Sequence, residues 1–187
     1  MNNNLSAYHS ELPFPPIKVK EKNLVYASLL MNGYAGFISE FTSLSQYFYH
    51  YLVNEEVDQE IANMLRNIST VETIHLDILG KIIKMLGGDP KYYAQDNYWT
   101  AEYITYGNNI LEQLEADLQN ELDAITNYKK TISQIQDPYI IGILERIILD
   151  EEVHVRLFEK AIEKVKESQK PKETLTDVVE EIFPSKK

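Results

Sequence analysis

Two copies of a Glu-x-x-His motif are the residues of this chain best suited to chemistry. The motifs are Glu72–His75 and Glu151–His154, and each follows a single glutamate, Glu40 or Glu121, by 32 and 30 residues respectively. Positions i and i+3 of a helix share a face, so each motif can present a carboxylate and an imidazole to one site. Four carboxylates and two imidazoles on four helices form the ligand set of a two-metal site inside a helix bundle.

These six residues all fall on stripes that are otherwise apolar at helical spacing. Unpaired charges there would be costly, and few basic residues lie on the stripes to pair with them. Two divalent cations would balance four carboxylates, whereas ordinary buried salt bridges are the competing interpretation. We therefore predict that Glu72 and Glu151 bridge two metal ions and that the others each bind one ion. The predicted ligands are Glu40, Glu72, His75, Glu121, Glu151 and His154.

The ligand types favour two iron or two manganese ions per chain, without distinguishing between them. Zinc would also fit by ligand type, but a zinc pair would supply no redox chemistry. The chain contains no cysteine, which excludes disulfides, thiolate zinc sites and iron–sulfur clusters within it.

Two tyrosines are further candidates for a catalytic role. Tyr47 and Tyr128 each lie seven residues, two helical turns, after Glu40 and Glu121. They either hydrogen-bond to the opposite ligands and act on metal-bound oxygen, or they are ordinary core tyrosines. With Glu72 and Glu151, they complete the predicted catalytic residues.

Four other polar residues have side chains that could act at such a site. Asp150 precedes Glu151, and it either orients a ligand histidine from outside or is an exposed aspartate. Asp117 lies one turn before Glu121, but a solvated position is expected for it. We expect His9 and His50 on the surface, because neither has a partner at ligand spacing.

The apolar periodicity predicts an all-α chain of four long helices. Asn54 is the expected N-cap of the second helix, and Asp137 followed by Pro138 is expected to begin the fourth. Short connections make two antiparallel hairpins, and a Tyr-rich linker of residues 89–107 can span about 60 Å, more than the length of a 30-residue helix. The expected helices cover about residues 23–53, 54–86, 108–136 and 138–169, within domains 1–21 (extended arm), 22–170 (bundle) and 171–187 (tail with a short helix).

The two hairpins have similar sequences. Residues 40–47 align with residues 121–128 in residue type, and the two Glu-x-x-His motifs lie 79 residues apart. A pseudo-twofold duplication would relate the hairpins and the two predicted metal positions.

The composition limits the classes of partner. The net charge of −11 argues against a nucleic-acid interface, which needs clustered Lys and Arg. No stretch is long and apolar enough to span a membrane, and residues 1–20 lack the apolar core of a signal sequence. We therefore predict a soluble, cytoplasmic protein.

At the six predicted ligands the chain resembles the ferritin-like superfamily, specifically its rubrerythrin, bacterioferritin and manganese-catalase branches. The resemblance covers about residues 23–168. It implies a ferritin-like four-helix bundle in which these six residues bind a di-iron or di-manganese centre. Such centres react with hydrogen peroxide or dioxygen, or oxidise ferrous iron for storage. Rubrerythrins usually carry a second glutamate where this chain has Ala124, and a cysteine-ligated domain as electron donor.

Three functions follow from this resemblance. The first is peroxide detoxification, either catalase-like or peroxidase-like, the latter requiring an external electron donor. The second is a ferroxidase and iron-storage subunit, and the third is a structural coat-type protein that keeps the metal-binding fold. A homo-oligomer is expected, with a dimer favoured.

Overall fold

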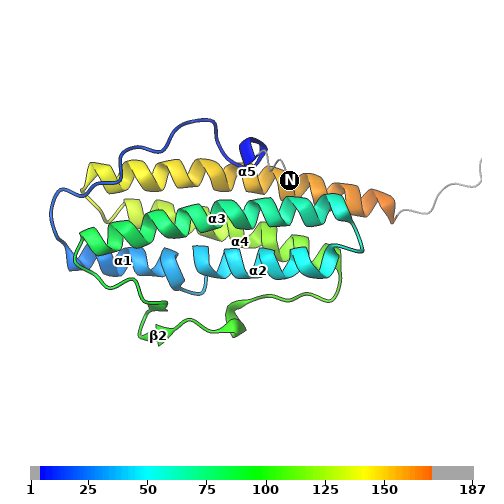
Figure 1. Ribbon diagram of the computed structural model, residues 1–187, viewed down its shortest axis with the longest axis horizontal. Coiled ribbons are helices and arrows are strands. Elements are labelled where there is room, and N and C mark those ends of the chain that lie inside the picture. The colour runs from blue at the N-terminus through cyan, green and yellow to red at the C-terminus, as the bar shows by residue number, and fades with distance from the viewer. Residues whose placement is uncertain (1–4, 170–187) are drawn as a thin grey trace, which may run out of the picture.

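A computed structural model of the chain describes residues 5–169, which form an elongated bundle of helices (Figure 1). Two segments placed end to end form the first bundle helix, and three longer helices complete the bundle. This confirms the predicted all-α four-helix architecture, whereas the predicted tail helix within residues 171–187 lies outside the described residues. The helices are α1 (Leu24–Ala35), α2 (Glu40–Asn54), α3 (Gln59–Met85), α4 (Ile110–Ile132) and α5 (Pro138–Ser168).

The first bundle helix was expected to be continuous from residue 23 to residue 53, and this was wrong. The helix is interrupted between Ala35 and Glu40. A Cβ atom on Gly36 would lie 2.5 Å from the Asn32 carbonyl oxygen, so the backbone turns here in a way that a larger residue would obstruct. Ser39 then caps α2 by accepting a hydrogen bond from the Thr42 N–H. The interruption places Glu40 in the first turn of a new helix.

The helix caps agree only in part with expectation. Asp58, not Asn54, caps α3 by accepting hydrogen bonds from two backbone N–H groups. Asn54 instead donates to the Gln113 side chain across the bundle, 2.6 Å away. Asp137 does cap α5, with Pro138 at its start, as predicted.

Two separate apolar clusters hold the bundle together, one toward each end. On α3, the buried apolar residues from Ile61 to Ile68 belong to one cluster and those from Leu76 to Ile83 to the other. On α5, the buried apolar residues from Ile140 to Ile148 and from Phe158 to Val165 are divided in the same way. Both Glu-x-x-His motifs lie in the gap between the clusters, so the fold presents a polar layer between two apolar ones.

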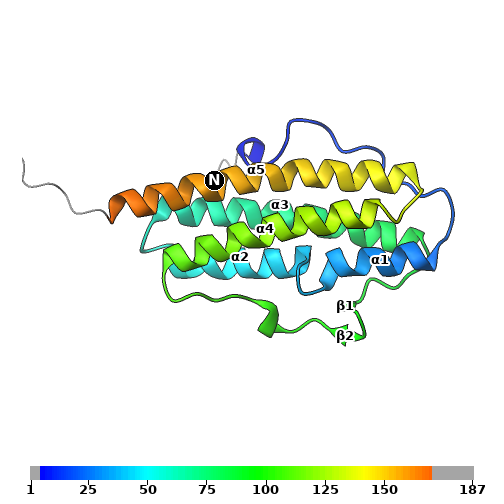
Figure 2. The same ribbon diagram turned by 180° about the vertical axis from the view of Figure 1, so that it is seen from behind.

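Two long segments that contain no α-helix run along opposite sides of the bundle (Figures 1 and 2). The N-terminal arm, residues 5–22, contains one turn of 3₁₀ helix, η1 (Leu5–Ala7), and passes along α5. The crossover between α3 and α4 passes along α1 and α2. It contains the antiparallel pair β1 (Tyr93–Ala94) and β2 (Asn97–Tyr98), followed by η2 (Ala101–Tyr103). Within residues 5–169 no helix has the length and apolar character needed to cross a membrane.

Candidate metal centre

The fold brings all six predicted ligand residues together at the middle of the bundle. Helix α2 contributes one of them, α3 two, α4 one and α5 two. Each of the four carboxylate residues is at most 3 % exposed, and both histidines are completely buried. The six residues are Glu40, Glu72, His75, Glu121, Glu151 and His154.

The six side chains form two groups that share two members. In each group, one ligand atom from every residue lies within 4.8 Å of the others. Glu72 and Glu151 belong to both groups, and this sharing is the arrangement needed for two carboxylates to bridge two ions. The groups are Glu40, Glu72, His75 and Glu151, and Glu72, Glu121, Glu151 and His154.

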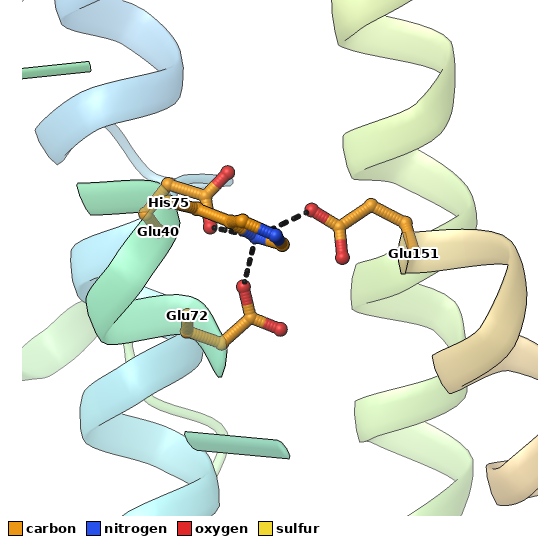
Figure 3. Close-up of side chains that lie close together, drawn as sticks. All are labelled: Glu40, Glu72, His75 and Glu151. Atoms are coloured by element: carbon orange, nitrogen blue, oxygen red, sulfur yellow. Dashed lines mark hydrogen bonds and ion pairs between the residues drawn. The ribbon is translucent and has the colours of Figure 1, made fainter. Parts of the chain in front are cut away.

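The oxygen atoms of the two shared glutamates are divided between the two imidazoles. In Figure 3 carboxylates from α2, α3 and α5 converge on His75. Its Nδ1 atom lies 3.1 Å from Glu72 Oε2 and 3.3 Å from Glu151 Oε1. The Nδ1 atom of His154 lies 3.0 Å from the other oxygen of each glutamate. Glu72 and Glu151 therefore each direct one oxygen to each half of the site.

The remaining glutamates each lie in one half only. Glu40 Oε2 is 3.4 Å from Nδ1 of His75, and Glu121 Oε1 is 3.3 Å from Nδ1 of His154. Each half thus contains three carboxylates and one imidazole nitrogen.

The outer nitrogen of each imidazole has an acceptor that fixes the tautomer. Nε2 of His75 is 3.0 Å from Asp150 Oδ2, and Nε2 of His154 is 2.9 Å from the backbone carbonyl of Tyr8. A carbonyl only accepts hydrogen bonds, so Nε2 of His154 carries the proton. In the neutral ring, Nδ1 then directs its lone pair into the carboxylate cluster, as a metal ligand must.

Asp150 is buried and contacts His75 from outside the cluster, which is the first of the two alternatives predicted for it, and it is not an exposed aspartate. Its Oδ1 atom accepts from the Ser10 N–H at 2.6 Å and lies 2.6 Å from the Arg146 guanidinium. Arg146 also donates to the backbone carbonyls of Ser10 and Leu12 in the N-terminal arm. The sequence predicted an extended arm, but neither its contact with the site nor the role of Arg146. The spacing of four residues between Arg146 and Asp150 was the available signal.

Each tyrosine lies near a glutamate of the opposite hairpin, namely the glutamate that lies in only one half of the site. The Tyr128 hydroxyl donates a hydrogen bond to Glu40. A Cβ atom on Gly33 would lie 3.0 Å from the Tyr128 ring, so the glycine allows this close approach. The Tyr47 hydroxyl accepts from the Asn120 amide at 2.9 Å and faces Glu121. The predicted contact with the opposite ligand is therefore present at Tyr128.

Two expectations about neighbouring polar residues were wrong. Asp117 and His50 were expected at the surface, yet both are completely buried. Nδ1 of His50 lies 2.9 Å from the Asp117 carboxylate, and its Nε2 donates to the carbonyl of Thr105 in the crossover. His9 is only partly exposed, and its Nδ1 lies 2.7 Å from the Ser10 carbonyl. The His50–Asp117 pair ties the crossover to α2 and α4.

Comparison with known proteins places the chain in a family. A model of the ferritin-like domain matches residues 38–168. The chain belongs to the ferritin-like family. The matched segment contains all six residues of the centre and excludes the N-terminal arm and α1.

Relatives of this ferritin-like chain include two kinds of protein. It is 24% identical over 172 residues to a probable manganese catalase of Clostridium acetobutylicum, covering 80% of this chain and 76% of the relative. It is 32% identical over 129 residues to the bacterioferritin of Mycobacterium tuberculosis, covering 67% of this chain and 77% of that one. The crystal structure of a manganese catalase from Anabaena has the same fold, with a TM-score of 0.77 at 24% identity, over 90% of this chain and 88% of that one.

Burial and mutual repulsion perturb the carboxylates of this ferritin-like centre. Burial, then the charge of Glu151, raises the pKa of Glu121 to about 7. The same two effects raise the pKa of Glu72 well above its usual value. Burial alone would also raise the pKa of Glu151, but His75 and His154 outweigh it and hold this pKa at about 2. Without metal, the centre must therefore bind protons to limit its negative charge.

The donor set fits metal ions better than it fits internal salt bridges. Among residues 5–169, Arg146 is the only Lys or Arg that is buried, and it pairs with Asp150 outside the cluster. Four buried atoms that converge on the His154 half make no hydrogen bond. Such atoms are rare in folded proteins unless an ion or water satisfies them. The four atoms are Glu72 Oε1, Glu121 Oε1, Glu151 Oε2 and His154 Nδ1.

A cavity of about 240 Å³ leads from the surface to the His75 half of the centre. It lies between the α1–α2 interruption and α4, and the buried residues Glu40, Tyr128 and Glu151 line it. Its exposed lining residues are largely uncharged, apart from Lys130. The interruption of the first bundle helix thus opens a route to the carboxylates.

Proposed function

We propose that this chain binds two iron or two manganese ions and uses them to consume hydrogen peroxide. The observation that carries the proposal is the division of the Glu72 and Glu151 oxygens between the two imidazoles. In this proposal Glu72 and Glu151 would each contribute to both metal positions. Glu40 and His75 would complete one position, and Glu121 and His154 would complete the other. Bound iron or manganese would supply the electrons for cleaving the O–O bond.

The protein's own groups would orient and confine the substrate. Burial, followed by the charge of Glu40, raises the pKa of Tyr128 well above 10, so its hydroxyl keeps its proton and acts as a donor. It lines the cavity beside Glu40, where an incoming molecule reaches the centre. The apolar clusters flank the polar layer toward the two ends of the bundle, so the cavity reaches the centre from the side.

The lining of the cavity supports a small uncharged substrate. Its surface end carries Lys130 and the amides of Asn127 and Gln134, with no carboxylate among the exposed lining residues. A positive side chain beside the opening disfavours a divalent cation, whereas peroxide or dioxygen is unaffected by it. This favours peroxide over ferrous iron as the molecule that uses this route.

A catalase-like cycle is the version that the chain supports best. Disproportionation converts two hydrogen peroxide molecules into two waters and dioxygen, so no external reductant is consumed. A peroxidase cycle would instead require electrons from an external donor, because these 187 residues contain no cysteine to bind a redox centre through thiolates. The similarity to a manganese catalase over 80% of the chain supports the first version.

The test is dioxygen release from peroxide by protein loaded with manganese or with iron, in the absence of reductant. Loaded wild-type protein should release one dioxygen per two peroxides, and Glu151→Ala should abolish the release. Glu145→Ala is the matched control, because Glu145 is an exposed glutamate on the same helix. A fully loaded protein that leaves peroxide unchanged, with and without a reductant, would refute the proposal.

An iron-storage subunit is the second candidate, favoured by the 32% identity to bacterioferritin. It would form a large hollow oligomer and take up ferrous iron far beyond two ions per chain. A small oligomer such as a dimer on a sizing column, retaining two ions after aerobic iron loading, would exclude this function.

A further inference from the structure

The residues before the two Glu-x-x-His motifs differ in a way that leaves the outer nitrogen of one histidine without a side-chain acceptor. Asp150 immediately precedes Glu151, whereas Val71 immediately precedes Glu72. Asp150 reaches across the bundle to Nε2 of His75 at 3.0 Å. Val71 is apolar and buried, so it cannot do the same for His154.

The N-terminal arm supplies the acceptor that the first motif lacks. The backbone carbonyl of Tyr8 lies 2.9 Å from Nε2 of His154, 146 residues away in sequence. Residues 8–14 are fixed against the bundle at several further points. The Ser10 N–H donates to Asp150, and Arg146 donates to the carbonyls of Ser10 and Leu12.

The arm also covers the outer side of the other histidine. The Phe14 ring meets the His75 ring edge-on, with ring centroids 6.1 Å apart. The Arg146 guanidinium lies over the Phe14 ring, 4.4 Å from its centroid. One backbone segment of the arm thus lies on the outer side of both imidazoles. It accepts a hydrogen bond from His154 directly, and it donates one to Asp150, which contacts His75.

We propose that the arm segment Tyr8–Phe14 is a positioning element of the metal centre, and that the Tyr8 carbonyl does for His154 what Asp150 does for His75. The proposal rests on the proposed metal binding but not on the reaction with peroxide. It makes the two metal positions unequal. The ion held by His154 depends on the arm, whereas the ion held by His75 depends on a side chain of the bundle itself.

The experiment compares metal retention in the full-length chain and in a chain that begins at Ser10. Both are loaded with manganese and dialysed against a chelator, and ions per chain and release rates are measured. The full-length chain should keep two ions. The shortened chain should lose one ion about 10- to 100-fold faster, the usual effect of removing such an outer partner. The remaining single ion should give the electron paramagnetic resonance signal of an isolated manganese ion.

Three variants separate positioning from a general structural effect. Tyr8→Ala keeps the backbone carbonyl, so in the full-length chain it should retain both ions. Val71→Asp in the shortened chain places a carboxylate where the pseudo-twofold relation predicts contact with His154, and it should restore slow release of the second ion. Val71→Asn offers a neutral acceptor at the same position if the aspartate variant does not fold.

A further variant tests the carbonyl in the complete chain. Replacing the amide between Tyr8 and His9 by an ester weakens the Tyr8 carbonyl as an acceptor and removes no side chain. This change should accelerate release of one ion and leave the helical circular dichroism unchanged.

Several results would overturn the inference. Equal retention of both ions by the full-length, shortened and ester chains would overturn this inference and leave the proposed function standing. The same would follow if a folded shortened chain lost an ion and neither Val71 variant restored its retention. A full-length chain that binds no metal would overturn it together with the proposed function. An inert but metal-loaded protein would overturn only the peroxide reaction.

Discussion

The Tyr128 hydroxyl on α4 donates its hydrogen bond to the Glu40 carboxylate on α2, across the two hairpins of the bundle. Tyr47 on α2 faces Glu121 on α4 in the same crossed manner. The pseudo-twofold relation suggested by sequence therefore extends from the two histidine groups to the tyrosines. The relation does not hold for the groups that bind Nε2 of the two histidines, which are the Asp150 side chain at His75 and the Tyr8 carbonyl at His154.

The crossed tyrosines give the first prediction. Tyr128→Phe removes the partner of Glu40, so we expect about 10-fold weaker binding of one ion, with the other unaffected. Tyr47→Phe should weaken the opposite position, because that ring faces Glu121. Titration of each metal-free variant with manganese measures both affinities. The same ion weakened in both variants would contradict the crossed arrangement.

The shared glutamates give the second prediction. Glu72→Ala and Glu151→Ala each remove a residue common to both groups, so neither ion should survive dialysis against a chelator. Glu40→Ala removes a residue from one group only, and one ion should remain. Elemental analysis of the dialysed variants counts the ions. Equal loss in all three variants would show that the bridging and terminal roles are not distinct.

The buried ion pair outside the cluster gives a third prediction, on stability. Asp150→Ala leaves the Arg146 guanidinium buried without its carboxylate, which should cost about 3 kcal/mol or more in unfolding free energy. The control is Asp77→Ala, which breaks an exposed pair with Lys81 at the same spacing of four residues. Its cost should be about 0.5 kcal/mol or less. Urea denaturation of the metal-free proteins measures both, and similar losses would contradict the assigned burial.

The access cavity gives a fourth prediction. Ala124 lines the cavity from α4, and Ala124→Leu should narrow it and lower kcat/KM for peroxide, while two ions remain bound. Ala116→Leu, on the same helix but outside this cavity, is the control. A normal peroxide rate in Ala124→Leu would show that the substrate takes another route.

The pH dependence of the metal-free protein gives a fifth prediction. Burial and Glu151 raise the pKa of Glu121 from 4.5 to about 7. The stability this group contributes is complete below pH 4.5 and is lost as pH rises through about 7. Burial lowers the pKa values of His75 and His154, but the surrounding carboxylates outweigh it and raise both above 6.5. Their contribution is therefore complete below 6.5 and is lost at higher pH.

These contributions add in the same direction, so metal-free protein should become less stable between about pH 5 and pH 8. Glu151 acts oppositely, because its pKa of about 2 gives stability that is present above pH 4.5 and lost only in stronger acid. Bound divalent ions replace the protons, and the metal-loaded protein should show a smaller decline over this range. Urea midpoints at several pH values measure the effect. Metal-free stability that rises over this range would contradict the prediction.

The sequence predicted the two Glu-x-x-His pairs because their spacing is local, and it predicted Glu40 and Glu121 because each lies on an apolar stripe about 30 residues before a motif. A glutamate and a histidine three residues apart meet on one helix face wherever the helix lies, and the apolar stripes show which face is inward. Helix periodicity also predicted the bundle, since α3, α4 and α5 each follow a stripe of buried residues.

Features that depend on long-range contacts could not be predicted in this way. The interruption after Ala35 follows from how the chain turns at Gly36, which helical periodicity does not record. His50 and Asp117 lie 67 residues apart, and only the packed bundle brings them together. The same holds for the arm, because a backbone carbonyl has no residue type by which a sequence pattern could show it.

The most direct test of the proposed metal centre is the metal content of untagged, purified protein, measured by mass spectrometry. This protein should contain about two iron or manganese ions per chain, retained after dialysis and lost in Glu72→Ala and Glu151→Ala. Protein that contains no metal and cannot be loaded with either one would contradict the proposed centre, and four buried glutamates would then need a different explanation.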